Sequence, residues 1–237
     1  MTAAPALELI DVHSTIGVSH ILQGVSLSAP PQTVTVILGR NGVGKTSTMR
    51  AILGLNKRTG SIRFNGEEIV AEPTYRIIQR GISYVPEDRD IFRALSVEEN
   101  LRVAERKDSE HRYDLVFELF PEMKERLKQQ AGTLSGGQQQ MLSLSRGLLN
   151  ENELMLIDEP TKGLAPRVVS EVVQVLERIR DIATIVMVEQ NLAAAKRLAG
   201  HVVVMAEGKT VAEGDRSLLT DEVQMRELLG IGTEKEH

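Results

Sequence analysis

The sequence predicts an α/β fold with a mainly parallel core sheet. Short apolar runs of strand length alternate with segments of helical spacing, which is the pattern of strands joined by crossover helices. A glycine-rich run at residues 39–46 separates one β-branched strand from the helix that follows it. A mostly helical stretch, about 88–150, interrupts the alternation and is expected to form an inserted helical subdomain.

The elements of the first half follow from apolar pattern and turn chemistry. Strands are expected, in chain order, at 7–11, 25–29, 33–38, 61–64 and 82–85, the fourth ending in a turn at Asn65 and Gly66. A helix is expected at 46–55. Ser96 and Glu99 have the spacing of a capping box and predict the start of the first inserted helix.

The remaining elements complete the alternation. Further helices are expected at 111–120, from Pro121 onward, at 138–149, at about 167–180 and at 217–229. Strands are expected at 154–157, 184–188, 202–205 and 210–212, the last two joined by a turn at Glu207 and Gly208. Residues 232–237 are expected to fray. No repeat or long linker divides the chain, so 1–237 is expected to be one domain.

Composition excludes several classes of protein. The formal net charge is −5 and no block of five Lys or Arg residues occurs, so nucleic acid is not expected as a partner. The absence of cysteine excludes disulfides and thiolate metal sites. The first residues lack the basic and apolar segments of a signal peptide, and no apolar run approaches the ~20 residues that cross a bilayer. A role at a membrane therefore requires a partner.

The glycine-rich run fits the phosphate-binding pattern G-x-x-x-x-G-K-[ST]. Gly39, Gly42 and Gly44 allow backbone conformations in which successive N–H groups converge on phosphate oxygens. Lys45 supplies a positive charge for the β- and γ-phosphates, and Thr46 offers a hydroxyl to Mg²⁺. The alternative, a glycine-rich turn with a chance lysine, does not account for the strand before the run and the helix after it.

Two carboxylates follow the strand at 154–157. Asp158 is expected to hold Mg²⁺ through its water shell, and Glu159 is expected to polarise an attacking water as a general base. A polar strand end that caps the next turn is the simpler alternative.

A second anion site is expected where Ser135 caps the helix that starts near Gln138. A hydroxyl and free N–H groups would lie at the positive end of that helix. Taken alone, these residues would indicate only a capped helix start.

Together these three motifs resemble the ATP-binding cassette (ABC) ATPase family, and the resemblance covers essentially the whole chain. It implies a P-loop NTPase fold of the ABC cassette type, with an N-terminal antiparallel β subdomain beside the parallel core sheet and the helical insertion. Four shorter runs resemble the ATP-binding subunits of bacterial branched-chain amino acid importers and of their urea or amide importer relatives: 84–89, 97–101, 163–166 and 188–191.

The resemblance implies a mechanism and a set of site residues. Two subunits, of the same or a paralogous chain, would associate head to tail and enclose two ATP molecules, and hydrolysis would loosen the pair. Residues implied to bind ATP, beyond the glycines, Lys45 and Thr46, are Asn41, Ser47, Ser135, Gly136, Gly137 and Gln138.

Three positions depart from the usual family pattern. Ile16 stands where an aromatic residue normally stacks on adenine, so an aliphatic contact or nearby His13 is expected to serve instead. Glu87 replaces a glutamine that reaches Mg²⁺ in the family. We expect Glu87 to bind Mg²⁺ together with Thr46 and Asp158. Gln190 replaces the switch histidine and, with Glu159, completes the expected catalytic pair.

The expected function is that of the ATP-hydrolysing subunit of a membrane importer. It would lie peripherally on the cytoplasmic face of the inner (plasma) membrane, contact integral permease subunits through residues 84–106, and act indirectly with a solute-binding protein. One alternative is a soluble ABC ATPase, but the interval between Lys45 and Ser135 has no room for a second cassette or a long coiled coil. Another is a nucleotide sensor with weak hydrolysis, which the intact Glu159 disfavours.

Overall fold

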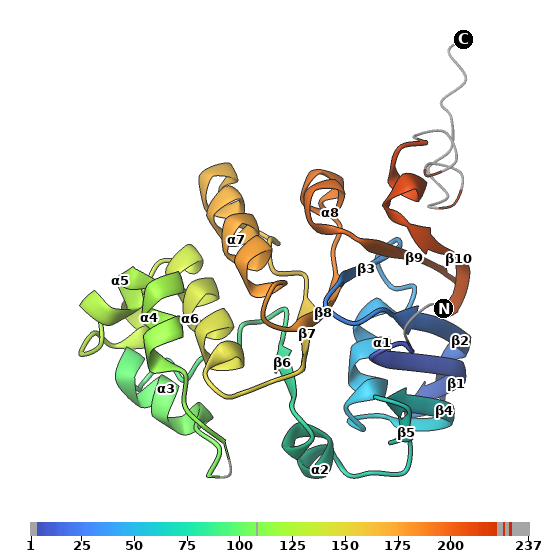
Figure 1. The fold of residues 1–237 in the computed structure, drawn as a ribbon, viewed down its shortest axis with the longest axis horizontal. Helices are drawn as coiled ribbons and strands as arrows, with labels where there is room; N and C mark the ends of the chain where they lie inside the picture. The colour runs from blue at the N-terminus through green and yellow to red at the C-terminus, as the bar shows by residue number, and fades with distance from the viewer. Residues whose placement is uncertain (1–3, 108, 222–224, 226–227, 229–237) are drawn as a thin grey trace.

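The computed structural model describes residues 4–107, 109–221, 225 and 228, and it contains two sheets (Figure 1). The first is four-stranded and antiparallel, in the order β2-β1-β4-β5. Its strands are β1 (Leu7–Ile16), β2 (Ser19–Ala29), β4 (Lys57–Phe64) and β5 (Glu67–Glu68).

The second sheet has six strands in the order β10-β9-β3-β8-β7-β6. All neighbours are parallel except β9 and β10, which form an antiparallel hairpin. Its strands are β3 (Val34–Leu38), β6 (Ile82–Val85), β7 (Leu154–Asp158), β8 (Thr184–Val188), β9 (His201–Ala206) and β10 (Lys209–Asp215). The expected fold, a parallel core sheet beside an N-terminal antiparallel sheet, is confirmed.

The helices divide into groups. The α-helices are α1 (Lys45–Ile52), α2 (Thr74–Gln79), α3 (Val97–Ala104), α4 (Tyr113–Leu119), α5 (Pro121–Glu125), α6 (Gly136–Leu148), α7 (Pro166–Ile179) and α8 (Leu192–Leu198). Short 3-10 helices occupy Ala131–Thr133 and Arg216–Leu219. Helices α3 to α6 lie together at the left of Figure 1, on the far side of the molecule from the antiparallel sheet. None of the helices in the described part of the chain has the length and apolar character needed to cross a membrane.

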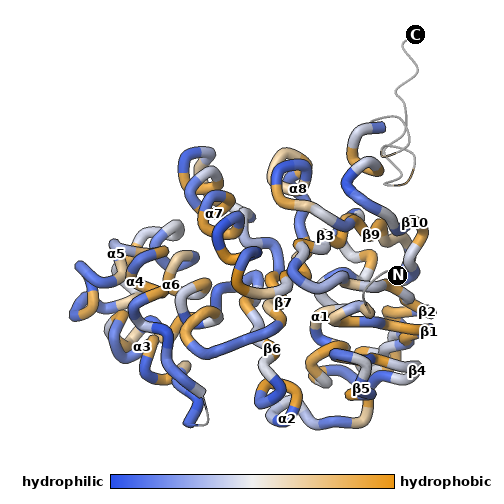
Figure 2. Tube along the Cα trace, in the orientation of Figure 1, coloured by the Kyte–Doolittle hydropathy of each residue, from blue (hydrophilic) through white to orange (hydrophobic). Residues whose placement is uncertain are grey.

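The parallel sheet separates two hydrophobic clusters. All five residues of β3, β7 and β8 are buried, and alternate residues point to opposite faces of the sheet. Val36 and Met187 pack on the side that carries α6, α7 and α8, whereas Ile37 and Val188 pack on the side of α1 and the antiparallel sheet. In Figure 2 the strands β1 and β2 and the helix α7 all show hydrophilic and hydrophobic stretches in alternation.

A carboxylate joins the two sheets. Oε1 of Glu213 on β10 accepts hydrogen bonds from the backbone N–H and the hydroxyl of Ser28 on β2, at 2.8 and 2.7 Å. The same oxygen lies 2.9 Å from Nε2 of His201 on β9. The hydrogen bonds from Ser28 and the contact with His201 lower the pKa of Glu213 against the opposing effect of its burial.

Several predicted boundaries were wrong. Strands β1, β2 and β4 extend well beyond the predicted 7–11, 25–29 and 61–64, because they continue as polar, bulged segments whose apolar alternation is broken. Elements β5, α2 and α8 were not predicted. Of the helix expected at 217–229, the described residues show a 3-10 helix at Arg216–Leu219; most of the remainder, and the expected frayed end at 232–237, lies outside the described residues.

Candidate active site

The carboxyl ends of four parallel strands meet at one edge of the six-stranded sheet. Ile37 of β3 and Asp158 of β7 both pair with Val188 of β8, and Val85 of β6 pairs with Ile157 of β7. The loops that follow these strands therefore converge. Ligands of open α/β sheets bind at this edge.

The glycine loop has the backbone geometry that only glycine accepts easily. Gly42 and Gly44 have φ angles of 82° and 104°, in the left-handed region. A Cβ on Gly44 would lie 2.8 Å from Cδ2 of Leu22, and one on Gly39 would lie 2.5 Å from the carbonyl oxygen of Met205. The loop is therefore packed tightly against β2 and β9.

Lys45 lies inside this loop at the first position of α1, and only 4% of its surface is exposed. Its Nζ donates hydrogen bonds to the carbonyl oxygens of Gly39 and Arg40, at 2.8 and 2.9 Å. Burial lowers the pKa of the ammonium group, and the negative charges of Glu159 and Asp158 oppose that effect. A cation held in a glycine cradle at a helix N-terminus fits a phosphate group.

The other ATP-binding residues expected around the loop lie beside Lys45. Asn41 is exposed at the tip of the loop, while Thr46 and Ser47 are half-buried in the first turn of α1. Within the described residues, α1 has no side-chain cap and no acidic residue in its first turn. Its positive end is left available to an anion.

Asp158 ends β7 and is fully buried. Burial raises the pKa of its carboxyl group to about 6, and contact with the Thr46 hydroxyl opposes the rise. The Tyr84 hydroxyl donates a long hydrogen bond of 3.4 Å to Oδ2, and burial raises the pKa of Tyr84 in turn. Oδ1 is buried and accepts no well-formed hydrogen bond from any described residue. A buried carboxylate oxygen without a donor, next to a threonine hydroxyl, fits Mg²⁺.

Glu159 has an unusual backbone conformation, with a φ angle of 47°. The turn is held by its N–H, which donates to the carbonyl of Val188 at 2.9 Å, and by the N–H of Lys162, which donates to its carbonyl at 3.1 Å. A non-glycine residue in the left-handed region costs on the order of 1 to 2 kcal/mol. The turn directs the carboxylate back toward Lys45, whose Nζ lies 4.0 Å from Oε1.

The two oxygens of the Glu159 carboxylate differ: Oε1 accepts a hydrogen bond, whereas Oε2 accepts none from the described residues and lies in an ion pair. Oε1 accepts a short hydrogen bond from Nε2 of Gln190, and Oε2 lies 3.2 Å from Nζ of Lys162. The expected catalytic pair, Glu159 and Gln190, is thus in direct contact, and Glu159 is 94% buried while Lys162 is half-exposed.

Within the described residues Glu87 makes no hydrogen bond to Asp158; instead it forms a close ion pair with Lys162. Glu87, Thr46, Tyr84 and Asp158 nevertheless line one small cavity of about 230 Å³. Glu87 is thus near the expected magnesium ligands but is held by a lysine.

The Ser135 motif forms the start of α6, as expected. Oγ of Ser135 accepts the N–H of Gln138 at 3.3 Å, and Oε1 of Gln138 accepts the N–H of Ser135 at 3.0 Å. The hydroxyl proton of Ser135 remains available to donate. Gly136 is exposed, and Gly137 is close to α7, because a Cβ there would lie 2.7 Å from Cγ1 of Val168. These residues belong to the helical group at the left of Figure 1, whereas α1 lies at the right.

The strand register separates Ile16 from His13. Ser14 is buried and pairs with Leu22, whose side chain meets the glycine loop, so Ile16 lies on that same face of β1 two residues later. His13 lies on the opposite face, where it stacks on His20 at 5.2 Å and lies 3.1 Å from Asp11. This placement favours Ile16 over His13 as the residue beside the glycine loop. Ile16 is 46% exposed beside the loop.

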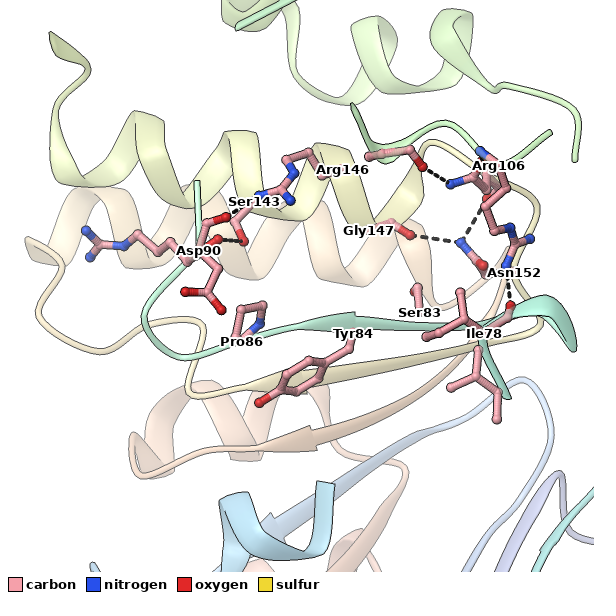
Figure 3. Close-up of a pocket in the computed structure, with 14 residues that line it drawn as sticks. Ile78, Ser83, Tyr84, Pro86, Asp90, Arg106, Ser143, Arg146, Gly147 and Asn152 are labelled. Atoms are coloured by element: carbon pink, nitrogen blue, oxygen red, sulfur yellow. Dashed lines mark hydrogen bonds between the residues drawn. The ribbon is translucent and has the colours of Figure 1, made fainter. Parts of the chain in front are cut away.

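A groove of about 300 Å³ lies between β6 and α6, behind the loop that carries Glu87 (Figure 3). Its walls include Tyr84, Asp90, Arg106 and Arg146. Arg146 donates to the carbonyl of Asp90 at 2.5 Å and lies over the Phe92 ring at 5.1 Å. Buried Asn100 holds the loop that follows, accepting the N–H of Phe92 at 2.9 Å and donating to its carbonyl at 3.0 Å.

Sequence reasoning missed three residues of this region. Glu189 is buried; its Oε1 accepts hydrogen bonds from the Thr161 hydroxyl and from the N–H groups of Gln190 and Asn191, at 2.7, 3.1 and 2.9 Å. Lys162 and Asn100 were not singled out either. The signal for Lys162 was its position three residues after Glu159; for Glu189 it was a carboxylate at the end of an apolar strand.

The chain is similar in sequence to ATP-binding proteins of transport systems. A family model described as ABC transporter matches residues 22–162. The chain is 36% identical over 222 residues to the high-affinity branched-chain amino acid transport ATP-binding protein BraG of Pseudomonas aeruginosa, covering 91% of this chain and 95% of that protein. It is 31% identical over 216 residues to the probable branched-chain amino acid transport ATP-binding protein LivF of Archaeoglobus fulgidus, covering 88% and 92%.

Similarity extends to another transport system and to solved structures. The chain is 30% identical over 220 residues to the lipopolysaccharide export system ATP-binding protein LptB of Escherichia coli, covering 89% and 91%. A solved ATP binding subunit of an ABC transporter superposes with a TM-score of 0.77 at 27% identity, covering 95% of each chain. A nucleotide-free ATP-binding cassette superposes with a TM-score of 0.82 at 23% identity, which shows the fold alone, covering 97% and 100%.

Proposed function

The chain belongs to the ABC transporter family and is an ATP-hydrolysing, ATP-binding subunit of a transporter. We propose that it powers an importer of branched-chain amino acids or of a related small amide or urea solute. The likeness to BraG and LivF, which are named for branched-chain amino acid transport, supports this solute class. The likeness to LptB, named for lipopolysaccharide export, is lower at 30% identity against 36% for BraG.

The observation that carries the proposed site is the convergence of Lys45, Asp158 and Glu159 at one sheet edge. Lys45 binds the β- and γ-phosphates, and the N–H groups of Gly39, Gly42 and Gly44 complete the cradle. The same proposal assigns to the phosphates, beside Lys45, the following residues of the loop and of α1: Asn41, Thr46 and Ser47.

Thr46 and Asp158 would hold Mg²⁺ in this proposal, and Glu87, which lines the same cavity, would join them. The ion supplies charge neutralisation to the phosphates when it is bound. Glu159 accepts a proton from the attacking water, and Gln190 orients the Glu159 carboxylate through its amide. Ile16 offers an aliphatic contact to the adenine ring.

Head-to-tail dimerisation completes the site in this proposal. Ser135, Gly136, Gly137 and Gln138 of a second copy, or of a paralogous chain, approach the γ-phosphate held by Lys45. This assignment is supported by the free hydroxyl proton of Ser135 and its place at the positive end of α6. Residues 1–237 act as one ATP-binding unit, and the helical segment of about 88–150 carries this second anion site.

Permease subunits dock at the groove beside α6 in the same proposal. Its walls carry the guanidinium groups of Arg106 and Arg146. The loop at 86–90, which includes Glu87, also lines the groove. The protein would then lie peripherally on the cytoplasmic face of the inner membrane, coupled indirectly to a solute-binding protein.

Phosphate release tests the enzymatic part. Wild type is expected to hydrolyse ATP, Glu159→Gln to bind ATP but lose at least about 100-fold in kcat, and Lys45→Ala to lose binding. Equal hydrolysis by wild type and Glu159→Gln would favour a nucleotide sensor instead.

Copurification tests the importer part. Co-expression with the permease pair of a branched-chain amino acid importer is expected to yield a complex that takes up a radiolabelled branched-chain amino acid in the presence of ATP. A Glu159→Gln complex is the matched control. A complex that assembles but exports or ignores amino acids would contradict the solute assignment.

A further inference from the structure

Lys162 connects two parts of the site that are far apart in the chain. It lies in the loop after β7, and its ammonium group is 3.2 Å from Oε2 of Glu159. The same group forms an ion pair with Glu87, which lies in the loop after β6. The ammonium group therefore sits between the proposed general base and a loop on the wall of the groove.

We propose that Lys162 is a positioning residue for Glu159, and that Glu87 controls it by holding its ammonium group. The inference rests on the proposed function, in which Glu159 is the general base. It goes beyond that function because it makes the geometry of the base depend on the loop at 86–90.

The first argument concerns the charges around Glu159. In the resting protein its carboxylate has two nearby cations, Lys45 at 4.0 Å from Oε1 and Lys162 at 3.2 Å from Oε2. A bound triphosphate attracts the ammonium group of Lys45 and adds negative charge beside Asp158. Glu159 then keeps Lys162 as its nearby cation. Because Glu159 is buried, water screens this attraction less than in an exposed pair, and the attraction holds the carboxylate against repulsion from the phosphates.

The second argument concerns the backbone. Glu159 occupies the left-handed region, at a φ angle of 47°, so its turn depends on the contacts around it. The N–H of Lys162 donates to the carbonyl of Glu159, while the Lys162 side chain reaches back to the Glu159 carboxylate. One residue thus fixes both ends of the base, through its backbone and through its side chain.

The third argument concerns the loop that carries Glu87. The N–H of Arg89 donates to the carbonyl of Pro86 at 3.0 Å, and the carbonyl of Arg89 accepts the Ser143 hydroxyl of α6 at 2.8 Å. The carbonyl of Asp90 accepts a hydrogen bond from Arg146, also on α6. A shift of α6 relative to β6 therefore displaces Glu87, and Lys162 transmits that displacement to Glu159.

A purely structural role predicts a different result. The side chain of Lys162 is 53% exposed and that of Glu87 is 32% exposed, and ion pairs of this kind contribute little to stability. If Lys162 formed only surface ion pairs, its removal would leave both kcat and KM for ATP unchanged.

The experiment compares Lys162→Met, Lys162→Arg and a control, Lys209→Met, in the full-length protein. Lys209 is exposed at the opposite edge of the six-stranded sheet. Lys162→Met is expected to lower kcat by about tenfold or more while KM for ATP changes by less than about twofold, because a displaced base slows chemistry without weakening binding. Lys162→Arg is expected to recover most of the loss, since it keeps the charge.

A double-mutant cycle tests whether Glu87 acts through Lys162. Glu87→Gln is expected to lower kcat in wild type and to lower it much less in the Lys162→Met background, because the lysine contact is already absent there. The two fold-losses in kcat are expected to differ by at least about threefold. Additive effects would overturn the control of Lys162 by Glu87.

Hydrogen exchange supplies a readout that needs no turnover. In the protein without nucleotide, the peptide that contains residues 84–90 is expected to exchange faster in Lys162→Met than in wild type or Lys209→Met. Unchanged exchange would overturn the link between Lys162 and this loop.

Two results separate this inference from the proposed function. If Glu159→Gln is inactive but Lys162→Met keeps kcat within about twofold of wild type, or Lys162→Arg is no better than Lys162→Met, the positioning role is overturned and the proposed function stands. If Glu159→Gln hydrolyses ATP as wild type does, the proposed function itself is wrong.

Discussion

The hydroxyl of Thr161 donates a hydrogen bond of 2.7 Å to Oε1 of Glu189, and this contact joins the loop after β7 to the loop after β8. Both side chains are buried. The first loop also carries Glu159, and the second also carries Gln190. The contact between Glu159 and Gln190 therefore depends on a neighbouring pair that does not itself reach the nucleotide loop.

Removing the Thr161 hydroxyl is expected to destabilise the protein. Thr161→Val takes one donor from a buried carboxylate, and such losses cost about 1 to 3 kcal/mol in the free energy of unfolding. Urea unfolding measures the change. Thr59→Val, at an exposed position of β4, is the control and is expected to stay within about 0.5 kcal/mol of wild type. Equal stability of the two variants would contradict the importance of this contact.

The carboxyl group of Glu189 is expected to make stability depend on pH. Burial raises its pKa, against the hydrogen bonds from Asn191, Thr161 and Gln190. A carboxyl group with a raised folded pKa stabilises the fold fully only below its unfolded pKa, about 4.3. That contribution is lost as the pH rises through the higher folded value.

Glu189→Gln removes this titration. The variant is therefore expected to gain unfolding free energy relative to wild type between about pH 5 and pH 8, measured by urea unfolding across that range. A difference between variant and wild type that does not change with pH would show that Glu189 does not titrate as its burial requires.

Gly44 is expected to tolerate no side chain. Gly44→Ala places a methyl group at a φ angle of 104° and against Leu22, so the glycine loop must shift. ATP affinity, measured by titration calorimetry, is expected to fall at least about tenfold. Gly66→Ala is the control, since Gly66 has a φ angle of 82° but no described atom within 4 Å of the new methyl group. It is expected to share the backbone cost and keep ATP binding.

Ile16 is expected to limit ATP affinity. Ile16→Tyr adds an aromatic ring on the face of β1 that meets the glycine loop, and stacking contributes about 0.5 to 1.5 kcal/mol, or roughly 2- to 13-fold in Kd. His13→Ala, on the opposite face, is expected to leave the affinity unchanged. Calorimetry of both variants checks this, and weaker binding by His13→Ala would show that the two faces are misassigned.

Features fixed by neighbouring residues were predicted correctly. The capping box of Ser96 and the N-cap of Ser135 form as expected, because each depends on a helix start and on side chains within one turn of it. Strand β6 has the predicted bounds, because the short run is bracketed by Gly81 and Pro86, two residues that interrupt regular structure. The parallel core sheet followed from the alternation of strands and helices.

Features that depend on distant residues could not be predicted. Glu87 and Lys162 are 75 residues apart in the chain, and their ion pair exists because β6 and β7 are neighbours in the sheet. The face on which His13 lies depends on register shifts between β1 and its neighbours. Strand order and bulges are set by packing between segments, which a reading of local pattern does not contain.

The left-handed turn at Glu159 costs the fold stability, whereas the proposed chemistry needs a carboxylate at this same residue. Glycine would relax that peptide and raise the melting temperature, but under the proposed function it would also remove the general base. Stability alone would therefore favour glycine at this position, and the proposed role of Glu159 as the general base accounts for the acid.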